Sequence, residues 1–378
     1  GGSGFSPLIY LYDPNGAQVT YDYDAIDTRI IHRTALAGTY TVKVVGYYDG
    51  DTGGYRLTYF KTPGEFVVPV GDEGGALVNG GKHEGALQIG DVDAWTVQAE
   101  VNDALLFRVG EVSGGNSFSP LIYLYDPNGQ QVTYDYDAVD ARITHRATIA
   151  GTYTLTVMGY YDGDAGGYAL HHVQTPATPL FIATGDQGGS VGSAAEITGE
   201  ISSGDLDPWV VYATVGSTLT FTITEVSGGN SFTPMISLYD PSGALVRNTW
   251  GATTATITHP VTSAGNHTLV VHGYYDGDVG SYRVTIAGAT APAAPTFASH
   301  PASQGVAAAA SALLSPTING TGPMRYQWFK DGVAIAGAKN SSYSVSQMDS
   351  AGSGIYLVEA SNELAKARSG GAVVGLSI

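Results

Sequence analysis

Paired aspartates recur three times in this chain, each time inside the sequence Tyr-Tyr-Asp-Gly-Asp. Two carboxylates two residues apart in a glycine-rich loop can converge on a hard cation at about 2.3–2.6 Å, so the chemistry they suggest is calcium binding. No Glu closes the spacing of an EF-hand loop. A tight turn, in which Asp accepts amide hydrogen bonds and Gly supplies positive φ, accounts for the same residues. The pairs are Asp49 and Asp51, Asp162 and Asp164, and Asp276 and Asp278.

A second acidic pattern precedes a tryptophan twice, as Gly-Asp-Val-Asp-Ala-Trp and as Gly-Asp-Leu-Asp-Pro-Trp. Its carboxylates also suit calcium, and Asp72 with Glu73 could join the earlier pair from the preceding segment. The later pair has Asp186 and Gln187 in that place, which is a weaker set of donors. A carboxylate beside the start of a strand can instead accept backbone amide hydrogen bonds. The pairs are Asp91 with Asp93 and Asp205 with Asp207.

Signatures of catalysis are weak. Residues 188–192 satisfy G-x-S-x-G, but a nucleophile elbow needs a strand-to-helix turn in an α/β sheet, so we interpret the match as chance. The nine histidines show no H-E-x-x-H or paired zinc spacing. His171 and His172 are adjacent and should point to opposite faces of a strand. The sequence therefore predicts that the protein is not an enzyme.

The elements that position these groups are repeated along the chain. The sequence GGNSFSPLIYLYDPNG at 114–129 recurs, slightly altered, at 1–16 and at 228–243, a period of about 113 residues. This period is an ordinary domain length, unlike that of a short solenoid repeat. Within a copy, Trp95 and Val97 alternate with polar neighbours, which is typical of a half-buried strand. We predict an all-β chain of tandem antiparallel, jelly-roll-like β-sandwiches.

Proline clusters after each Asp-Gly-Asp segment indicate the boundaries, because linkers favour Pro and small residues. The predicted first, second and third units are 1–64, 67–175 and 180–289, and residues 292–378 form a C-terminal domain. The first unit is only the second half of a sandwich, too small and too apolar at its edges to persist alone. Its missing strands are expected upstream in a longer polypeptide or from another chain by strand addition.

Composition narrows the classes of function. The net charge is −18, with the acidic excess ahead of residue 292, and this disfavours nucleic acid because phosphate binding needs a basic face. Cations are natural counter-ligands, although the acidity could simply keep a glycine-rich surface soluble. The absence of cysteine removes disulfides and thiolate sites. No stretch approaches the about 20 apolar residues of a membrane span.

The order of the motifs carries a family resemblance. The Asp-x-Asp-x-Trp strand, a strand pair, Leu-Tyr-Asp-Pro-Asn-Gly and a Gly-x-Tyr strand follow one another within residues 67–289 and, in part, within 1–64. In this order they resemble the bacterial pre-peptidase C-terminal (PPC) domain. The resemblance implies a β-sandwich appended to secreted bacterial proteases and other exported proteins, one that sometimes binds calcium and does not catalyse.

The last part of the chain differs from the repeats. The sequence PMRYQWFKDGVAIAGA and the later SGIYLVEASNELAKARSGG resemble a bacterial immunoglobulin-like domain. Trp328 would be its buried strand C tryptophan and Tyr356 its tyrosine-corner residue. Val358 stands where antibody domains have a cysteine, so apolar packing replaces the disulfide. Gly352 stands where such domains usually have Asp, which predicts a looser corner.

Tyrosines recur beside the acidic groups. They form Tyr-Asp-Tyr-Asp at 21–24 and 134–137, and pairs at 47–48, 160–161 and 274–275. Exposed rows of rings could stack on sugars or on another protein. Because such alternation more often leaves one ring in the core and one half-covered outside, we expect that arrangement here.

These observations predict a non-enzymatic, secreted or cell-surface bacterial protein that builds a fibre, stalk or adhesive array. Its expected partners are copies of the same chain, joined by inter-chain strand completion, with calcium stiffening the contacts between acidic loops. Two alternatives remain open. One is the accessory C-terminal region of a secreted hydrolase, and the other is a glycan-binding module whose tyrosine-rich faces meet a surface glycan.

Overall fold

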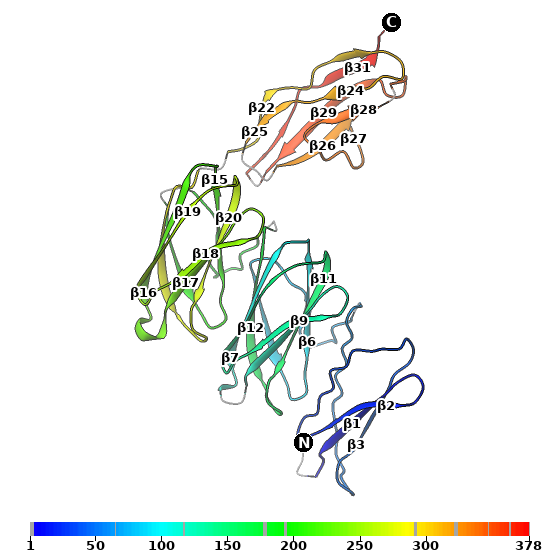
Figure 1. The fold of residues 1–378 in the computed structure, drawn as a ribbon, viewed down its shortest axis with the longest axis vertical. Helices are drawn as coiled ribbons and strands as arrows, with labels where there is room; N and C mark the ends of the chain where they lie inside the picture. The colour runs from blue at the N-terminus through cyan, green and yellow to red at the C-terminus, as the bar shows by residue number, and fades with distance from the viewer. Residues whose placement is uncertain are drawn as a thin grey trace.

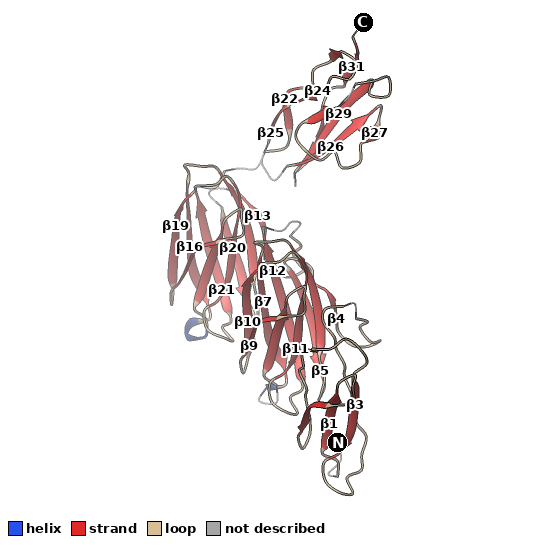
Figure 2. Cartoon of the chain, turned by 45° about the vertical axis from the view of Figure 1, so that its right-hand side comes forward, coloured by secondary structure: helices blue, strands red, loops and turns tan. Residues whose placement is uncertain are grey.

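The computed structural model describes residues 4–64, 66–115, 118–176, 180–192, 195–290, 293–320, 324–346, 348–362 and 364–377. Over these residues the chain consists of strands and loops with short 3-10 segments and no α-helix, which confirms the predicted all-β class. The units and the C-terminal domain follow one another in chain order (Figure 1), and strands dominate each of them (Figure 2). None of the described residues belongs to a helix long and apolar enough to cross a membrane.

The second unit is a sandwich of two sheets, with strand orders β4-β6-β11-β8-β9 and β10-β7-β12-β5. Its strands are antiparallel, as predicted, apart from the described pair β4 and β6, which runs parallel. The strands are β4 (Gly74–Ala76), β5 (Gly81–Leu87), β6 (Asp93–Ala99), β7 (Ala104–Ser113), β8 (Pro120–Tyr125), β9 (Gln131–Tyr136), β10 (Asp140–Arg146), β11 (Gly151–Gly159) and β12 (Gly166–Thr175).

Burial in the second unit follows the predicted alternation only where one face is free. On β6, Trp95 and Val97 are buried while Gln98 is exposed. On β7 and β12 nearly every position is buried, including both His171 and His172. The outer face of these two strands is covered by the third unit, which explains why the alternation fails there.

The third unit repeats this topology, with strand orders β13-β15-β20-β17-β18 and β14-β21-β16-β19. The short parallel strand recurs as β13, beside β15. The elements are β13 (Gly189–Val191), β14 (Glu196–Ile201), β15 (Asp207–Ala213), β16 (Thr218–Ser227), η2 (Gly229–Ser231), β17 (Pro234–Tyr239), β18 (Leu245–Trp250), β19 (Thr254–Pro260), β20 (Gly265–Gly273) and β21 (Gly280–Ala287).

The first unit has one three-stranded sheet, β2-β1-β3, formed by β1 (Pro7–Tyr12), β2 (Gln18–Tyr23) and β3 (Thr41–Gly46). It corresponds to β9-β8-β11 of the second unit. Residues 53–62, which correspond to β12, form no strand, because the described chain offers them no counterpart of β5 or β7. Tyr55 and Leu57 are therefore 61% and 52% exposed, whereas their counterparts Tyr168 and Leu170 are almost fully buried.

The C-terminal domain packs its own core around Trp328, which is fully buried. The hydroxyl of Tyr356 donates to the carbonyl of Gly352 at 2.8 Å, so the tyrosine corner is closed rather than loose. Asp349 Oδ1 accepts the amide of Gly352 at 2.7 Å, which fixes the backbone at this corner. The strands are β22 (Thr296–Ser299), β23 (Gln304–Val306), β24 (Ala312–Leu314), β25 (Thr317–Asn319), β26 (Arg325–Lys330), β27 (Val333–Ala334), β28 (Tyr343–Val345), β29 (Gly354–Ser361), β30 (Lys366–Arg368) and β31 (Ala372–Leu376).

Candidate cation sites and unit junctions

The Asp-Gly-Asp segments form tight turns closed by their second aspartate. Oδ2 of Asp164 accepts the amides of Ser119 at 3.1 Å and of Tyr161 at 3.0 Å. Gly163 has a φ of +83°, a conformation that suits glycine. Asp51 and Asp278 accept the corresponding amides in the other two turns. In these turns Asp accepts backbone amides and Gly has a positive φ, as the tight-turn alternative to calcium binding predicted.

The first aspartate of each turn points toward a neighbouring unit where one precedes it. Asp276 Oδ1 lies 3.4 Å from Arg142 Nη2 of the second unit. Burial, and then the charges of Asp24 and Asp27 in the first unit, raise the pKa of Asp162. Asp49 is exposed. None of these turns belongs to the two groups of three or more metal-ligating side chains that converge within the described residues.

The first acidic cluster consists of Asp72, Glu73 and Asp93, whose oxygens lie within 4.8 Å of one another. Pairing of Gly74 on β4 with Ala94 on β6 brings the linker carboxylates beside the start of β6. Asp93 is completely buried, and its Oδ2 accepts the hydroxyl of Tyr168 at 2.5 Å. Its Oδ1 is buried without a hydrogen-bond donor. A buried carboxylate oxygen without a donor is costly, and a cation would satisfy it.

Electrostatics agree with this geometry. Burial raises the pKa of Asp93 to about 7, and the neighbouring charges of Asp91 and Asp72 act in the same direction, whereas the hydrogen bond from Tyr168 opposes them. A divalent cation would favour the ionised carboxylate. Asp91 has a different role, because its Oδ1 accepts the amide of Val92 at 3.0 Å. Of the predicted pair, Asp93 therefore belongs to the first acidic cluster, whereas Asp91 accepts a local backbone amide.

The second acidic cluster consists of His171, Asp186 and Asp205. Asp186 and Asp205 belong to the third unit, whereas His171 comes from β12 of the second unit. His171 Nε2 lies 3.3 Å from Asp205 Oδ1 and 4.0 Å from Asp186 Oδ2. The cluster opens into a cavity of about 230 Å³ that Lys82 and Glu200 also line.

Asp207 lies beside this second cluster and corresponds to Asp93. It is fully buried, accepts the hydroxyl of Tyr282 at 2.6 Å, and has an Oδ1 without a donor. Burial and the charge of Asp205 raise the pKa of Asp207 well above its usual range. The Asp-x-Asp-x-Trp pattern therefore builds the same buried chain of carboxylate, tyrosine and tryptophan in both complete units.

Sequence reasoning placed His171 and His172 on opposite faces, which the structure confirms. The ring of His172 stacks on Phe107 in the core at a centroid distance of 4.7 Å. The approach of His171 to the acidic cluster was not predictable from sequence, because its partners Asp186 and Asp205 lie in the next unit. Ser190 of the G-x-S-x-G match lies on the three-residue strand β13 and in no strand-to-helix turn.

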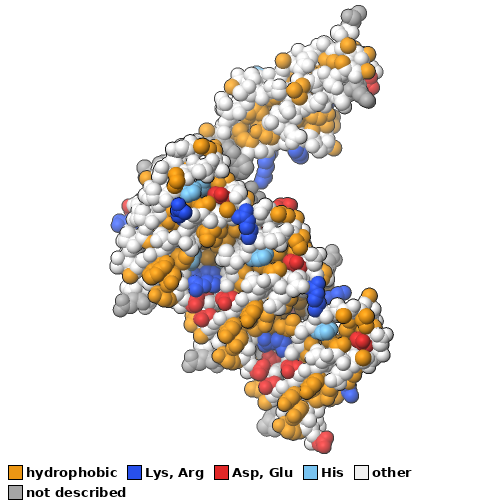
Figure 3. Space-filling model, in the orientation of Figure 1, with side chains coloured by type: hydrophobic (Ala, Val, Ile, Leu, Met, Phe, Trp, Pro, Cys, Tyr) orange, Lys and Arg blue, Asp and Glu red, His pale blue; other side chains and the backbone are white. Residues whose placement is uncertain are grey.

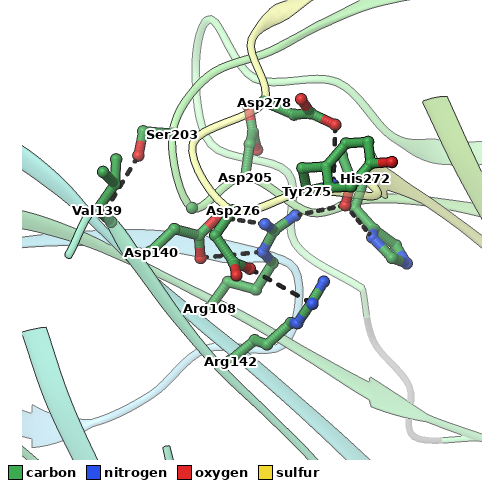
Figure 4. A network of polar contacts seen from close by, with 12 residues as sticks. Arg108, Val139, Asp140, Arg142, Ser203, Asp205, His272, Tyr275, Asp276 and Asp278 are labelled. Atoms are coloured by element: carbon green, nitrogen blue, oxygen red, sulfur yellow. Dashed lines mark hydrogen bonds and ion pairs between the residues drawn. The ribbon is translucent and has the colours of Figure 1, made fainter. Parts of the chain in front are cut away.

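A buried ion pair occupies the junction between the second and third units (Figure 4). Arg108 on β7 and Asp140 on β10 are 3% and 1% exposed. Arg108 Nε lies 3.2 Å from Asp140 Oδ1, and its Nη2 contacts Oδ2. The remaining Nη1 crosses the junction and donates to the carbonyl of Gly273 at 3.3 Å.

Apolar side chains also pack across this junction. Six buried side chains form one cluster across the junction, three from each unit. Glycine allows the backbones to touch, since a Cβ on Gly110 would lie 2.3 Å from the carbonyl of Ser203. The cluster comprises Ala104, Leu106, Val173, Leu206, Tyr239 and Val270.

The two junctions between units use equivalent residues. Arg29 of the first unit donates to the carbonyl of Gly159 at 2.9 Å, and Arg142 of the second unit donates to the carbonyl of Tyr274 at 3.0 Å. We call Arg29 and Arg142 the latch arginines. A threonine pair joins each junction as well, Thr62 with Thr154 and Thr175 with Thr268. Figure 3 shows basic side chains beside acidic ones between successive units.

The tyrosine rows lie outside the core, contrary to the expectation that one ring of each would be buried. Tyr134 and Tyr136 are 54% and 44% exposed. Residues directly opposite each other on neighbouring strands share a face of the sheet, and on β9 the partners of the buried Leu124 and Ile122 are Thr133 and Asp135, so the tyrosines between them face outward. Tyr136 stacks on Tyr160 at a centroid distance of 3.8 Å.

Comparison with protein-family models gives no match, and comparison with curated proteins gives none either. Solved structures give likenesses of fold. The pre-peptidase C-terminal domain of a collagenase from Bacillus anthracis is 19% identical over 27% of this chain and 95% of its own, with a TM-score of 0.24. A three-domain immunoglobulin segment of titin is 15% identical over 81% of this chain and 95% of its own, also with a TM-score of 0.24. The four N-terminal immunoglobulin domains of Dscam1 are 14% identical over 69% of this chain and 66% of theirs, with a TM-score of 0.27. In fold, the chain is an all-β protein in which a single-sheet first unit, two β-sandwich units of the same topology and a C-terminal β domain follow one another.

Proposed function

We propose that this chain is a non-enzymatic, secreted or surface-exposed bacterial repeat protein whose units stack at fixed spacing to form a rigid stalk or fibre. The observation that carries the proposal is the repeated junction, in which equivalent threonines pair and the equivalent latch arginines donate to neighbouring backbone carbonyls of the same turn in the next unit. A head-to-tail contact that recurs in one direction propagates a linear array.

Rigidity follows from the character of the contact between the second and third units. Neighbouring domains move relative to each other unless their interface is large and hydrophobic. Here the buried apolar cluster contains residues of both units, and the ion pair of Arg108 with Asp140 lies on the second unit's side of the interface. We expect the two units to move as one body, which is the mechanical property a stalk requires.

In this proposal calcium stiffens the unit at the first acidic cluster. Its donors are all carboxylate oxygens, the ligand type that calcium prefers. Asp72 and Glu73 belong to the linker and Asp93 to β6, so a bound ion would fasten the linker to the sheet. The buried Oδ1 of Asp93 without a donor is the observation that fits the ion.

Self-association is the second part of the proposal. The first unit leaves an inner face open, with Leu57 and Tyr59 at 52% and 76% exposure. The second unit supports a particular type of occupant, because β5 and β7 pair there with β12 in the covering sheet and β6 pairs with β11 in the sheet that they cover. We expect a strand set of that type to dock on the first unit, with a tryptophan indole placed to donate to the hydroxyl of Tyr55 as Trp95 does to Tyr168.

A distance measurement across the junction tests the rigid stalk. The chain has no cysteine, so Thr148→Cys with Thr262→Cys gives two unique spin labels at equivalent exposed positions. We expect one narrow distance distribution in the parent protein. Arg142→Thr should broaden it, because Thr256 stands at the latch position of the third unit, where no unit of the same kind follows. Arg247→Thr, an exposed arginine that donates to the carbonyl of Val246, is the control and should change nothing.

A broad distribution in the parent protein would contradict the stalk. Light scattering on the same samples tests association. Leu57→Asp should abolish concentration-dependent growth in mass, whereas Val67→Asp, which alters an apolar side chain 90% exposed outside that face, should not. A parent chain that stays monomeric at all concentrations would remove the self-association part alone.

A further inference from the structure

The second acidic cluster differs from the first in containing an imidazole. His171 Nδ1 lies 2.7 Å from the carbonyl of Gly204, which can only accept, so Nδ1 carries the proton of the neutral ring. The lone pair of Nε2 is then directed toward Asp205 and Asp186. An imidazole that donates one ring N–H to a backbone carbonyl while presenting the other nitrogen is the arrangement found in metal-ligating histidines.

A buried oxygen without a donor points to a ligand at this place. Asp205 is 5% exposed, and its Oδ2 accepts the amide of Ser202 at 3.1 Å. Its Oδ1 has no hydrogen-bond donor and lies 3.3 Å from His171 Nε2. Two ligand atoms this far apart can share one ion bound at about 2.0–2.2 Å from each. The nearby Lys82 is paired with Glu84 at 3.1 Å.

We infer that His171, Asp186 and Asp205 bind a divalent transition metal, best zinc, that fastens the second unit to the third. The cavity beside the cluster leaves room for water or a further ligand at the fourth position. This goes beyond the proposed stalk, because it concerns a different ion, a different set of ligands and one particular junction.

The donor set decides between zinc and calcium at this cluster. Imidazole suits zinc, copper and nickel, whereas calcium takes six to eight oxygen ligands. The third unit also has Gln187 where the second has Glu73, which lowers the number of anionic oxygens here. At the first junction Thr58 stands at the position of His171, and Arg56 Nη1 lies 3.8 Å from Asp91. Among the described residues the converging ligands of the first acidic cluster are carboxylates without an imidazole.

Calorimetry with zinc chloride on the metal-free full chain tests the site. We expect one high-affinity equivalent of zinc, and cobalt in its place should give the visible absorption of a four-coordinate ion. His171→Thr introduces the residue that the first junction carries. Because losing even an outer-shell partner of a metal weakens binding about 10–100-fold, losing the imidazole should weaken it at least as much. Asp186→Asn should weaken binding in the same direction.

His32→Ala removes an exposed histidine in the first unit and controls for adventitious binding, so its titration should match that of the parent chain. Circular dichroism checks that each variant is folded. Absence of zinc binding by the parent chain, or equal binding by His171→Thr, would overturn the inference. Either outcome leaves the stalk proposal standing, since the latch arginines do not contact His171.

Discussion

The two junctions between units share a backbone arrangement but differ in buried charge. Both have a latch arginine and a threonine pair. Only the second junction has the pair of Arg108 with Asp140, because Arg108 lies on β7 and the first unit has no counterpart of that strand among its described residues. The latch therefore forms in a unit that has only the counterparts of β8, β9 and β11, whereas the charged core of the junction needs β7 as well.

The chemistry of each junction also differs at single positions. His272 in the third unit corresponds to Met158 in the second, and His171 in the second corresponds to Thr58 in the first. Burial, and then the positive charge of Arg108, lower the pKa of His272 to about 3. At this position the second unit therefore has a side chain that cannot be protonated, Met158, whereas the third unit has one that can, His272.

Asp140→Ala should produce the largest difference between the junctions. It leaves the guanidinium of Arg108 buried without its partner, and breaking a buried ion pair in this way costs about 3–5 kcal/mol of unfolding free energy. Urea unfolding followed by tryptophan fluorescence measures the loss. The matched variant Asp27→Ala alters the equivalent, partly exposed residue of the first unit and should cost less than about 1 kcal/mol. Equal losses in the two variants would refute the difference that we draw between the junctions.

Much of the fold was predictable from sequence because it rests on local patterns. The period-two alternation at Trp95 and Val97, the repeated turn sequences and the corner residue Tyr356 each specify their own neighbourhood. The partial sandwich of the first unit was also expected from the repeat alone. Burial of both faces of β12 was not, because it depends on a second unit that no local pattern reveals.

The candidate site was predictable only in part, for the same reason. The joining of Asp72 and Glu73 to Asp93 was anticipated, since all three belong to one unit. The approach of His171 to Asp205 was not, because it crosses from one unit to the next. The sequence nevertheless contains an indication of contacts between units. Arg29 and Arg142 recur at equivalent positions of the first two units, whereas the third unit, which no further unit of the same kind follows, has Thr256 there.

His272→Met tests the titratable side of the comparison and should have a smaller effect. A histidine whose pKa is lower in the folded chain is neutral there while the unfolded chain binds the proton, so its stabilisation is present above about pH 6.5. That stabilisation is lost as the pH falls from 6.5 toward 3. We expect the parent chain to lose about 1–2 kcal/mol more than the variant between pH 7 and pH 5, measured by urea unfolding at each pH. Parallel pH profiles would show that His272 does not titrate in this way.

Removal of calcium should give the smallest effect and separates the two acidic clusters. An ion that binds only the folded chain stabilises it by about 1.4 kcal/mol at about ten times its dissociation constant, so added calcium should raise the melting temperature and EDTA should reverse the change. Glu73→Gln gives the first cluster the residue that the third unit carries as Gln187, and it leaves the hydrogen bond between Tyr168 and Asp93 in place. The calcium shift should therefore shrink in Glu73→Gln and persist in His171→Thr, because the imidazole belongs to the other cluster. A parent chain whose melting temperature is the same in calcium and in EDTA would show that the carboxylates of the first cluster are held by the protein alone.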